Sequence, residues 1–210
     1  MQKQTITDLD LAGKRVLIRV DFNVPIKDGV ISDDTRLRAS LGTIQYALAQ
    51  GATLVLASHL GRPNGTPSDT LSLKPVADRL EKLLNHPVFF SPETIGTAAI
   101  EAVLEVGSGG IVLLENLRFH SGEEKNDPEF ARELSLLADI FINDAFGVAH
   151  RAHASTEGIV NYLNQSAAGL LMTDELNYLG DALWKPKRPF AAVLGGAKIS
   201  GKLEVVQNLL

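Results

Sequence analysis

Short apolar runs rich in branched side chains alternate along this sequence with segments that have helical periodicity. A run that is apolar at every position predicts a strand buried on both faces, as in a parallel sheet. The expected strands are 16–20, 53–57, 88–90, 111–114 and 140–142. Because helical segments separate them, the pattern predicts an α/β fold, a three-layer, Rossmann-like parallel sheet with helices on both faces.

Several helices have recognisable start signals. We expect Ser32 to cap the first helix, with Asp33 and Asp34 in its first turn, where the helix dipole favours acidic side chains. Pro75 is expected in the first turn of the second helix, and Asp127 is expected to be the N-cap of a later one.

The end of the chain indicates a second folding unit. Thr173 is expected to cap a helix that the Pro/Lys segment 185–189 ends, and 190–194 is expected to be another strand. That strand and the helix after it have no partners of their own, so we expect the chain to stop inside a second α/β domain. The expected boundaries are 1–170 for the first domain, 171–189 for an interdomain helix and hinge, and 190–210 for the start of the second domain.

Composition narrows the class of partner. Lys and Arg total 20 against 25 Asp and Glu, which disfavours a broad nucleic-acid surface but leaves room for a compact basic pocket. The absence of cysteine excludes thiolate chemistry and cysteine-ligated metals. The apolar runs are far shorter than the ~20 residues of a membrane span, and the N-terminus lacks a signal-peptide core. We therefore expect a cytoplasmic protein without nucleic-acid or membrane partners.

Polar and basic residues follow the expected strands at their carboxyl ends, where open parallel sheets bind ligands. These candidates are Asp21, Asn23, Arg36, His59, Arg62, Arg118 and Arg151. Four arginines in one crevice would repel one another unless an anion lay among them, and the guanidinium group is suited to bidentate binding of phosphate or carboxylate. The sequence therefore predicts an anion site at this end of the sheet.

Each candidate also has an ordinary structural interpretation. A single arginine can be a solvated residue or an ion-pair partner, and Asp21 and Asn23 can form a turn before Pro25. His150 and His153 are three residues apart, but no carboxylate–histidine motif accompanies them. We favour structural or anion-side roles for these two histidines over metal ligation.

A second candidate site is the segment Gly195–Leu203, which follows an expected strand and opens a helix, as a phosphate loop does. From Gly196 it nearly fits G-x-x-x-x-G-K-[ST], but Leu203 at the last position cannot ligate magnesium. Lys198 and Lys202 share one helix face and can both reach phosphate oxygens. The alternative is a glycine-tolerant turn with two exposed lysines.

Several long motifs, taken in order, resemble the phosphoglycerate kinase family. They are Arg19–Pro25, Ser58–Pro63, Glu115–Phe119, Asn143–Gly147, His150–Ser155 and Gly195–Lys202. The resemblance runs from Val16 to Leu210. The sequence departs from the family pattern at Val148, Glu157 and Gly201, and of these only Gly201 belongs to a ligand loop.

The resemblance implies a two-domain, hinge-closing kinase that transfers phosphate reversibly between 1,3-bisphosphoglycerate and ADP, giving 3-phosphoglycerate and Mg-ATP. It makes 1–170 the substrate domain for 3-phosphoglycerate and 190–210 the start of a truncated nucleotide-binding domain. Asp21 and Asn23 would bind the glycerate hydroxyl and carboxyl region, and Arg36 would stabilise the transferring phosphoryl group. The non-transferred phosphate would be held by His59, Arg62, Arg118 and Arg151. The other implied substrate-binding residues are Phe22, Leu60 and Gly61. Lys198 and Lys202, which share the catalytic role of Arg36, would meet the nucleotide phosphates together with Gly195 and Gly196.

The resemblance also sets expectations for the whole molecule. Mg²⁺ would arrive with ATP or ADP and be held mainly by the nucleotide and by residues beyond this chain, with no metal ligand within it. We expect a monomer, and we expect this chain alone to bind 3-phosphoglycerate without turnover. The alternatives are a non-catalytic domain that binds organic phosphates and a P-loop NTPase, against which Leu203 counts.

Overall fold

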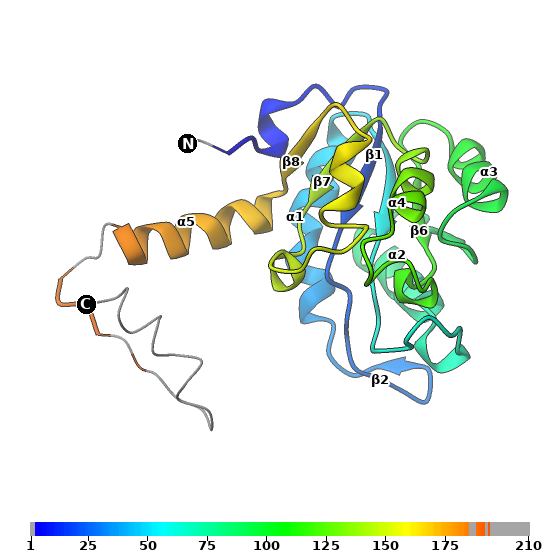
Figure 1. Cartoon of the computed structure of the whole chain (residues 1–210), viewed down its shortest axis with the longest axis horizontal. Helices are drawn as coiled ribbons and strands as arrows, with labels where there is room; N and C mark the ends of the chain where they lie inside the picture. The colour runs from blue at the N-terminus through cyan, green and yellow to red at the C-terminus, as the bar shows by residue number, and fades with distance from the viewer. Residues whose placement is uncertain (1–2, 185–187, 192, 194–210) are drawn as a thin grey trace. The chain divides into compact units, whose positions relative to one another are not determined.

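The structure, a computed structural model, describes residues 3–184, 188–191 and 193 of the 210-residue chain (Figure 1). It divides into two compact units, Met1–Thr173 and Asp174–Leu210. The first unit contains strands β1 to β8 of the described part of the chain. Within the described residues, no helix is both long enough and apolar enough to cross a membrane.

A parallel sheet forms the middle layer of the first unit, with the strand order β5–β6–β4–β1–β7–β8 (Figure 1). Its strands are β1 Arg15–Arg19, β4 Thr53–Ala57, β5 Phe89–Ser91, β6 Ile111–Leu114, β7 Ile140–Asn143 and β8 Ser166–Ala168. Every neighbouring pair in this sheet is parallel. Two short strands, β2 Ile26–Lys27 and β3 Val30–Ile31, form a separate antiparallel hairpin.

Helices cover both faces of the sheet. They are α1 Thr35–Ala49, α2 Lys74–Leu84, α3 Thr97–Val106 and α4 Pro128–Ser135. A fifth helix, α5 Leu170–Trp184, begins in the first unit and continues into the second. Short 3₁₀ turns are η1 Ile6–Asp8, η2 Asp69–Leu71, η3 Leu117–Phe119, η4 Phe146–Val148 and η5 Gly158–Asn161. The first unit thus has the predicted α/β architecture.

The alternation of side chains along β1 shows how the layers are made. Val16 and Ile18 belong to one hydrophobic cluster, together with residues of α1 and α2. Leu17, which points to the opposite face, belongs to a second cluster with residues of α3 and α4. Because both faces of β1 are covered, every residue from Val16 to Arg19 is buried. This explains why the strand is apolar at successive positions and does not alternate with polar residues.

One predicted helix cap is confirmed. The Asp127 carboxylate accepts a hydrogen bond of 2.9 Å from the Phe130 backbone N–H at the start of α4. The prediction for Ser32 is wrong, because α1 begins only at Thr35 and Asp34 occupies the N-cap position. Ser32 follows β3, and its hydroxyl donates to the Pro25 carbonyl in the hairpin.

The prediction that Thr173 caps a helix is also wrong. α5 begins at Leu170, and the Thr173 hydroxyl, inside the helix, donates to the Gly169 carbonyl at 2.7 Å. Side chains far away in the sequence accept from the first N–H groups of α5. Thr43 Oγ1 accepts from Leu170 N at 3.0 Å, and Asp144 Oδ1 accepts from Met172 N at 3.1 Å.

Two differences from the expected strands remain. β8 was not expected, because Ser166–Ala168 has no apolar branched residue to mark it. Of the expected strand 190–194, the described residues Phe190, Ala191 and Val193 are not in a strand, and the others lie outside the described residues. A strand depends on a neighbour that pairs with its backbone N–H and C=O groups, and none of the described strand pairs includes these residues.

Candidate functional site

A cavity of about 260 Å³ lies beyond the carboxyl ends of β1, β4, β6 and β7. We call it the arginine pocket. It is lined by Asp21, Asn23, Arg36, His59, Gly61, Arg62, Arg118, Gly147, Val148 and Arg151. β4 and β7 pair with opposite edges of β1, so the chain changes direction across the sheet at this point, as at ligand sites of open α/β sheets. The structure therefore brings together all four candidate arginines, His59, Asp21 and Asn23.

Hydrogen bonds between loops hold the floor of the pocket. Asn116 Oδ1 accepts from Leu60 N at 3.1 Å, and its Nδ2 donates to the Leu60 carbonyl at 2.8 Å. Ser58 Oγ accepts from Phe22 N at 2.9 Å. The loops after β1, β4 and β6 are thus connected to one another. Phe22 and Leu60 are buried and do not line the pocket, so they support its backbone and do not present side chains to it.

Gly61 is required by both conformation and space. Its φ is +62°, in the left-handed region that favours glycine. A Cβ atom at this position would lie 2.7 Å from Leu71 Cδ2. The Gly61 N–H donates to Asn23 Oδ1 at 2.9 Å, and its carbonyl accepts from Arg118. The backbone of Gly61 therefore connects two other residues that line the pocket, Asn23 and Arg118.

Arg118 is the most deeply set of the four arginines, with only 5% of its side chain exposed. Its Nη1 donates to the Gly61 carbonyl at 2.8 Å, and its Nε lies 3.2 Å from the Glu124 carboxylate. Burial lowers the pKa of the Arg118 guanidinium, and the charge of Glu124 opposes that shift. An arginine side chain nevertheless stays protonated at physiological pH, so Arg118 supplies a fixed positive charge.

The other three arginines reach the pocket from its exposed rim. Arg36 Nη1 donates to Asp21 Oδ2 at 2.6 Å, and Arg151 Nε lies 3.3 Å from His150 Nε2. Within the described part of the chain, no hydrogen bond or ion pair engages the Arg62 guanidinium. The lining thus combines four guanidinium groups with a single carboxylate, that of Asp21. This excess of positive charge suits an anion.

His59 is neutral in this setting. Burial, followed by the positive charges of Arg19 and Arg118, lowers its pKa from 6.5 to about 2. Its Nδ1 lies 3.1 Å from Arg19 Nη2. Although His59 was the histidine that sequence analysis favoured for anion binding, it can act there only as an uncharged imidazole.

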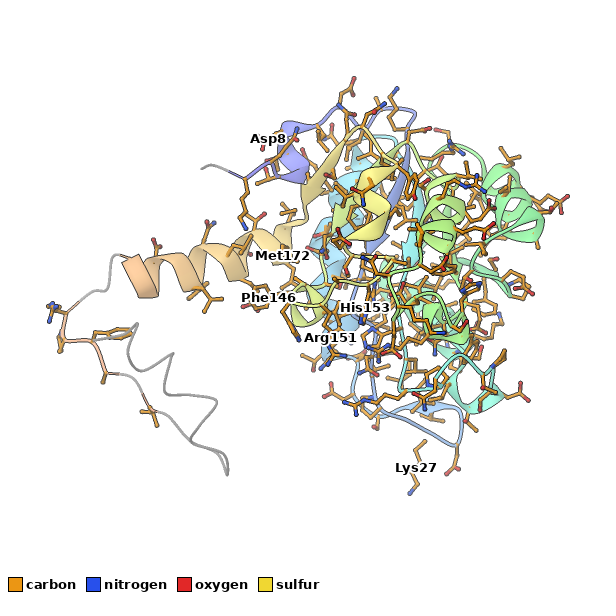
Figure 2. The ribbon with its side chains drawn as sticks, viewed as in Figure 1. Asp8, Lys27, Phe146, Arg151, His153 and Met172 are labelled. Carbon is orange, nitrogen blue, oxygen red and sulfur yellow. The ribbon has the colours of Figure 1, made fainter. Side chains whose placement is uncertain are left out.

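The other two histidines near the pocket follow β7, in the segment that Phe146, Arg151 and His153 mark in Figure 2. His153 is buried, and its Nδ1 lies 3.9 Å from Glu123 Oε1. Burial lowers the pKa of His153, and the charge of Glu123 opposes that shift. His150 is exposed and contacts Arg151. Among the described residues, no group of three or more histidine, aspartate or glutamate side chains could hold a metal ion.

Sequence analysis missed several residues of this region. Gly147 and Val148 line the pocket, and Arg19 and Glu123 lie buried behind it. Arg19 had a signal of its own, because it is the one charged residue in the expected strand 16–20. The second candidate site, with Gly195, Gly196, Lys198 and Lys202, lies outside the described residues.

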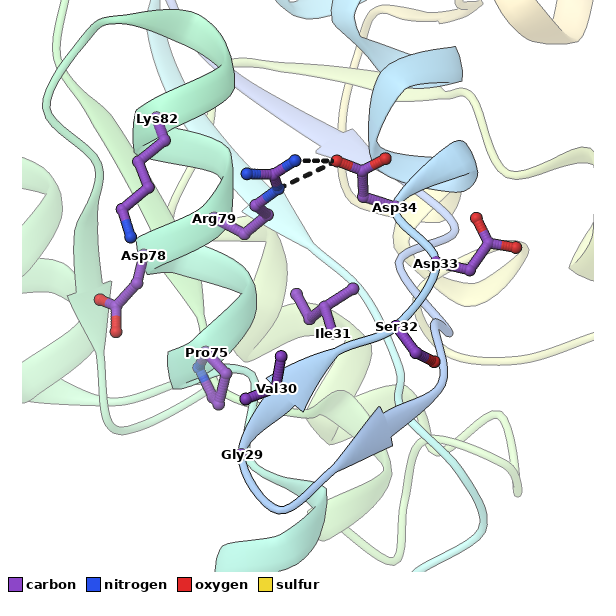
Figure 3. Close-up of a pocket in the computed structure, with 10 residues that line it drawn as sticks. All are labelled: Gly29, Val30, Ile31, Ser32, Asp33, Asp34, Pro75, Asp78, Arg79 and Lys82. Carbon is purple, nitrogen blue, oxygen red and sulfur yellow. Dashed lines mark hydrogen bonds and ion pairs between the residues drawn. The ribbon is translucent and has the colours of Figure 1, made fainter.

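A larger cavity, of about 660 Å³, lies between the β2–β3 hairpin and α2 (Figure 3). We call it the hairpin pocket. Arg79 of α2 points across it to Asp34, and its Nε and Nη2 donate to one carboxylate oxygen at 2.9 and 2.5 Å. Asp34 also accepts from Arg38 at 2.8 Å. The charges of these three side chains are therefore paired with one another.

Comparisons with known proteins agree on one family. The family model described as "Phosphoglycerate kinase" matches residues 6–210. The chain is 56% identical over 210 residues to a phosphoglycerate kinase of Chloroherpeton thalassium, covering all of this chain and 53% of the relative. It is 58% identical over 218 residues to that of Acidobacterium capsulatum, covering 100% of this chain and 54% of the relative. The chain thus spans about half the length of these relatives.

Solved structures give the same result. The phosphoglycerate kinase of Coxiella burnetii superposes with a TM-score of 0.87 at 41% identity, over 99% of this chain and 52% of the other. That of Pyrococcus horikoshii also has a TM-score of 0.87, at 36% identity, over 98% of this chain and 52% of the other.

Proposed function

The chain belongs to the phosphoglycerate kinase family, and we propose that its arginine pocket binds 3-phosphoglycerate and 1,3-bisphosphoglycerate. In the reaction proposed for the whole protein, the acyl-phosphate P–O bond of 1,3-bisphosphoglycerate breaks and a terminal oxygen of ADP bonds to the phosphorus. The products are ATP and the free carboxylate of 3-phosphoglycerate. The observation that carries the proposal is the excess of four guanidinium groups over one carboxylate in the pocket.

Different residues of the pocket bind different groups of the ligand. Arg62, Arg118 and Arg151 hold the phosphate that is not transferred, and His59 adds a neutral contact. Asp21 and Asn23 accept from and donate to the hydroxyl and carboxyl region of the glycerate. Arg118 is already held by Gly61 and Glu124, whereas Arg62 and Arg151 are exposed and can adjust to the anion. Hydrogen bonds to charged groups contribute about 1.5–3 kcal/mol each.

Arg36 has a different role, because it acts on the phosphoryl group in transit. It occupies the first turn of α1, and its ion pair with Asp21 keeps the guanidinium at the edge of the pocket. Phosphoryl transfer depends on positioning and on stabilising charge that spreads over the equatorial oxygens, and it requires no covalent nucleophile. The absence of cysteine is compatible with such chemistry.

The remaining assignments rest on the family and on the sequence. We propose that Lys198 and Lys202, with Gly195 and Gly196, contact the nucleotide phosphates, and that Mg²⁺ arrives with ATP or ADP. We also propose a cytoplasmic monomer without nucleic-acid or membrane partners. Since the chain spans about half the length of its relatives, we propose that by itself it binds 3-phosphoglycerate without turnover. A coupled ATP assay on the purified chain should give only background activity.

Calorimetric titration with 3-phosphoglycerate tests the proposed site. Binding should weaken as salt is added, because screening reduces the attraction of the exposed arginines for the anion. Arg151→Ala should weaken binding about 10-fold, the loss of one hydrogen bond to a charged group. The matched control is Arg132→Ala, an exposed arginine of α4 that pairs with Glu133 outside the pocket. Binding that is absent at low salt, or unaffected by salt, would contradict the proposal.

A further inference from the structure

Behind the arginine pocket, four buried side chains form a continuous line of hydrogen bonds. Arg19, the last residue of β1, donates from Nη2 to His59 Nδ1 at 3.1 Å and from Nε to Ser155 Oγ at 2.8 Å. Ser155 Oγ lies 2.5 Å from Glu123 Oε1. We call this line, Glu123–Ser155–Arg19–His59, the buried relay. At most 4% of each residue in it is exposed.

The direction of each hydrogen bond in the relay is determined. A guanidinium group can only donate, so His59 Nδ1 must accept and carries no proton. Ser155 Oγ likewise accepts from Arg19, and its own proton therefore goes to Glu123. The Ser155 backbone N–H donates to the other oxygen of Glu123 at 3.0 Å. Arg19 thus donates in both directions, and the line ends at two acceptors, the Glu123 carboxylate and His59 Nδ1.

Arg19 is also held from the strand side. Its Nη1 donates to the Val20 carbonyl at 2.5 Å. The guanidinium therefore has partners on three of its edges and cannot turn away from His59. The titratable groups that face His59 are Arg19 of β1, Arg36 of α1, Arg118 of η3 and the ring of His153. All of these groups oppose protonation of His59.

We propose that Arg19 is a positioning residue that holds His59 neutral with its proton on Nε2, so that His59 presents an N–H donor to the anion in the arginine pocket. His59 lines that pocket, and its Nδ1 edge is occupied by Arg19, so the Nε2 edge is the one available to a ligand. The opposite tautomer would turn a lone pair toward the anion. The part of this inference that concerns the anion rests on the function proposed above.

Nitrogen NMR of the ligand-free chain, labelled with ¹⁵N-histidine, tests the tautomer directly. In the unmodified chain, His59 should show a protonated Nε2 and an unprotonated Nδ1, unchanged from about pH 5 to about pH 8. The proposal would be overturned by a proton on Nδ1 or by a His59 that titrates in this range.

Arg19→Met then tests whether Arg19 sets this state. Without the donor and the charge, His59 should populate both tautomers and its pKa should rise. Arg15→Met is the matched control, because Arg15 is the other arginine of β1 but pairs with Asp139 and does not contact His59. His59 should keep its signature in that variant. An unchanged signature in Arg19→Met would overturn the proposal.

The double variant Arg19→Met/Glu123→Gln removes the buried carboxylate that the single substitution leaves without its cation, so it gives the same readout if Arg19→Met does not fold.

Sulfate, which stays divalent throughout the pH range, then probes the pocket. Both variants should bind sulfate about 10-fold more weakly at about pH 8, where Arg15→Met should bind normally. Normal sulfate binding by the Arg19 variants would overturn the role in anion binding. Failure of the proposed substrate to bind would leave the tautomer result intact, so the two proposals fail separately.

Discussion

The arginine pocket and the hairpin pocket differ in how their charges are arranged. The hairpin pocket is the larger, at about 660 Å³ against about 260 Å³. Its acids all have partners: Asp34 holds Arg38 and Arg79, Asp78 holds Lys74, and Asp33 accepts from Thr35. In the arginine pocket, by contrast, one carboxylate faces four guanidinium groups. The smaller cavity therefore has the greater excess of charge.

Charge and backbone support distinguish the arginine pocket from the hairpin pocket better than volume does. Arg38 and Arg79 would gain little from a bound anion, because each would have to give up its existing partner, the Asp34 carboxylate. The loops of the arginine pocket are joined through Asn116, Gly61 and Ser58, so its backbone is held in place before the ligand arrives. Preorganisation of this kind lowers the cost of binding. Substitutions in the two pockets should consequently have different effects.

The largest expected difference concerns two arginines that lie two residues apart on α1. Arg36 lines the arginine pocket, whereas Arg38 pairs with Asp34 of the hairpin pocket. Arg36→Ala should reduce kcat by at least ~100-fold and change the 3-phosphoglycerate Kd only several-fold, because the guanidinium acts on the transition state. Arg38→Ala should leave kcat within about 2-fold, since surface substitutions have small effects. Steady-state kinetics can be measured on a chain extended with the remaining segment of the Chloroherpeton thalassium relative.

Arg36→Lys sharpens this test, because lysine keeps the charge but loses the planar fork, and should restore kcat only in part. If Arg36→Ala loses affinity and keeps kcat, Arg36 is a binding group and the proposed role is wrong.

The next largest effect concerns affinity. Arg62→Ala should weaken 3-phosphoglycerate binding about 10-fold, the loss of one hydrogen bond to a charged group. Arg79→Ala, in the hairpin pocket, should leave the Kd unchanged, because Arg79 is engaged with Asp34. Calorimetric titration of both variants measures the difference. Equal losses in the two variants would mean that the pockets do not differ in the way we infer.

A smaller effect concerns acid stability. Hydrogen bonds from Arg38 and then Arg79 lower the pKa of Asp34 below its ordinary value of 3.8. A carboxyl group whose pKa is lower in the folded state stabilises the fold above its unfolded pKa, and this stabilisation is lost as the pH falls. Asp34→Asn should therefore lower the melting temperature by a few degrees at neutral pH and by less below about pH 4. Thermal melts of both proteins measure this. A difference in melting temperature that stayed the same across the pH range would contradict the prediction.

The smallest effect concerns Val30 at the rim of the hairpin pocket, where 66% of its surface is exposed. Val30→Ser should change the free energy of unfolding by no more than about 0.5 kcal/mol, as for most surface substitutions. It should leave 3-phosphoglycerate binding unchanged. A clear loss of affinity in this variant would mean that the hairpin pocket takes part in binding.

Local signals in the sequence predicted the elements that local interactions determine. The apolar runs at 53–57 and 111–114 coincide with β4 and β6, and Asp127 caps α4 through its own first turn. The start of α5 was predicted wrongly because residues far away along the chain determine it. α5 starts at Leu170 because Thr43 and Asp144 accept from its first N–H groups, and neither residue is close to α5 in the sequence.

The sequence by itself determined which residues would meet, since parallel strands bring their carboxyl ends to one edge and the basic residues follow those ends. Only the tertiary structure decided what state those residues are in. Arg38 and Arg36 are close together on one helix, yet Arg38 pairs with Asp34, whereas Arg36 pairs with Asp21 in a pocket that has an excess of guanidinium groups. His59 is neutral because burial and charges from distant segments of the chain act on it together. Solvation and electrostatic energies depend on distances in space. These distances cannot be obtained from the separation of residues along the chain.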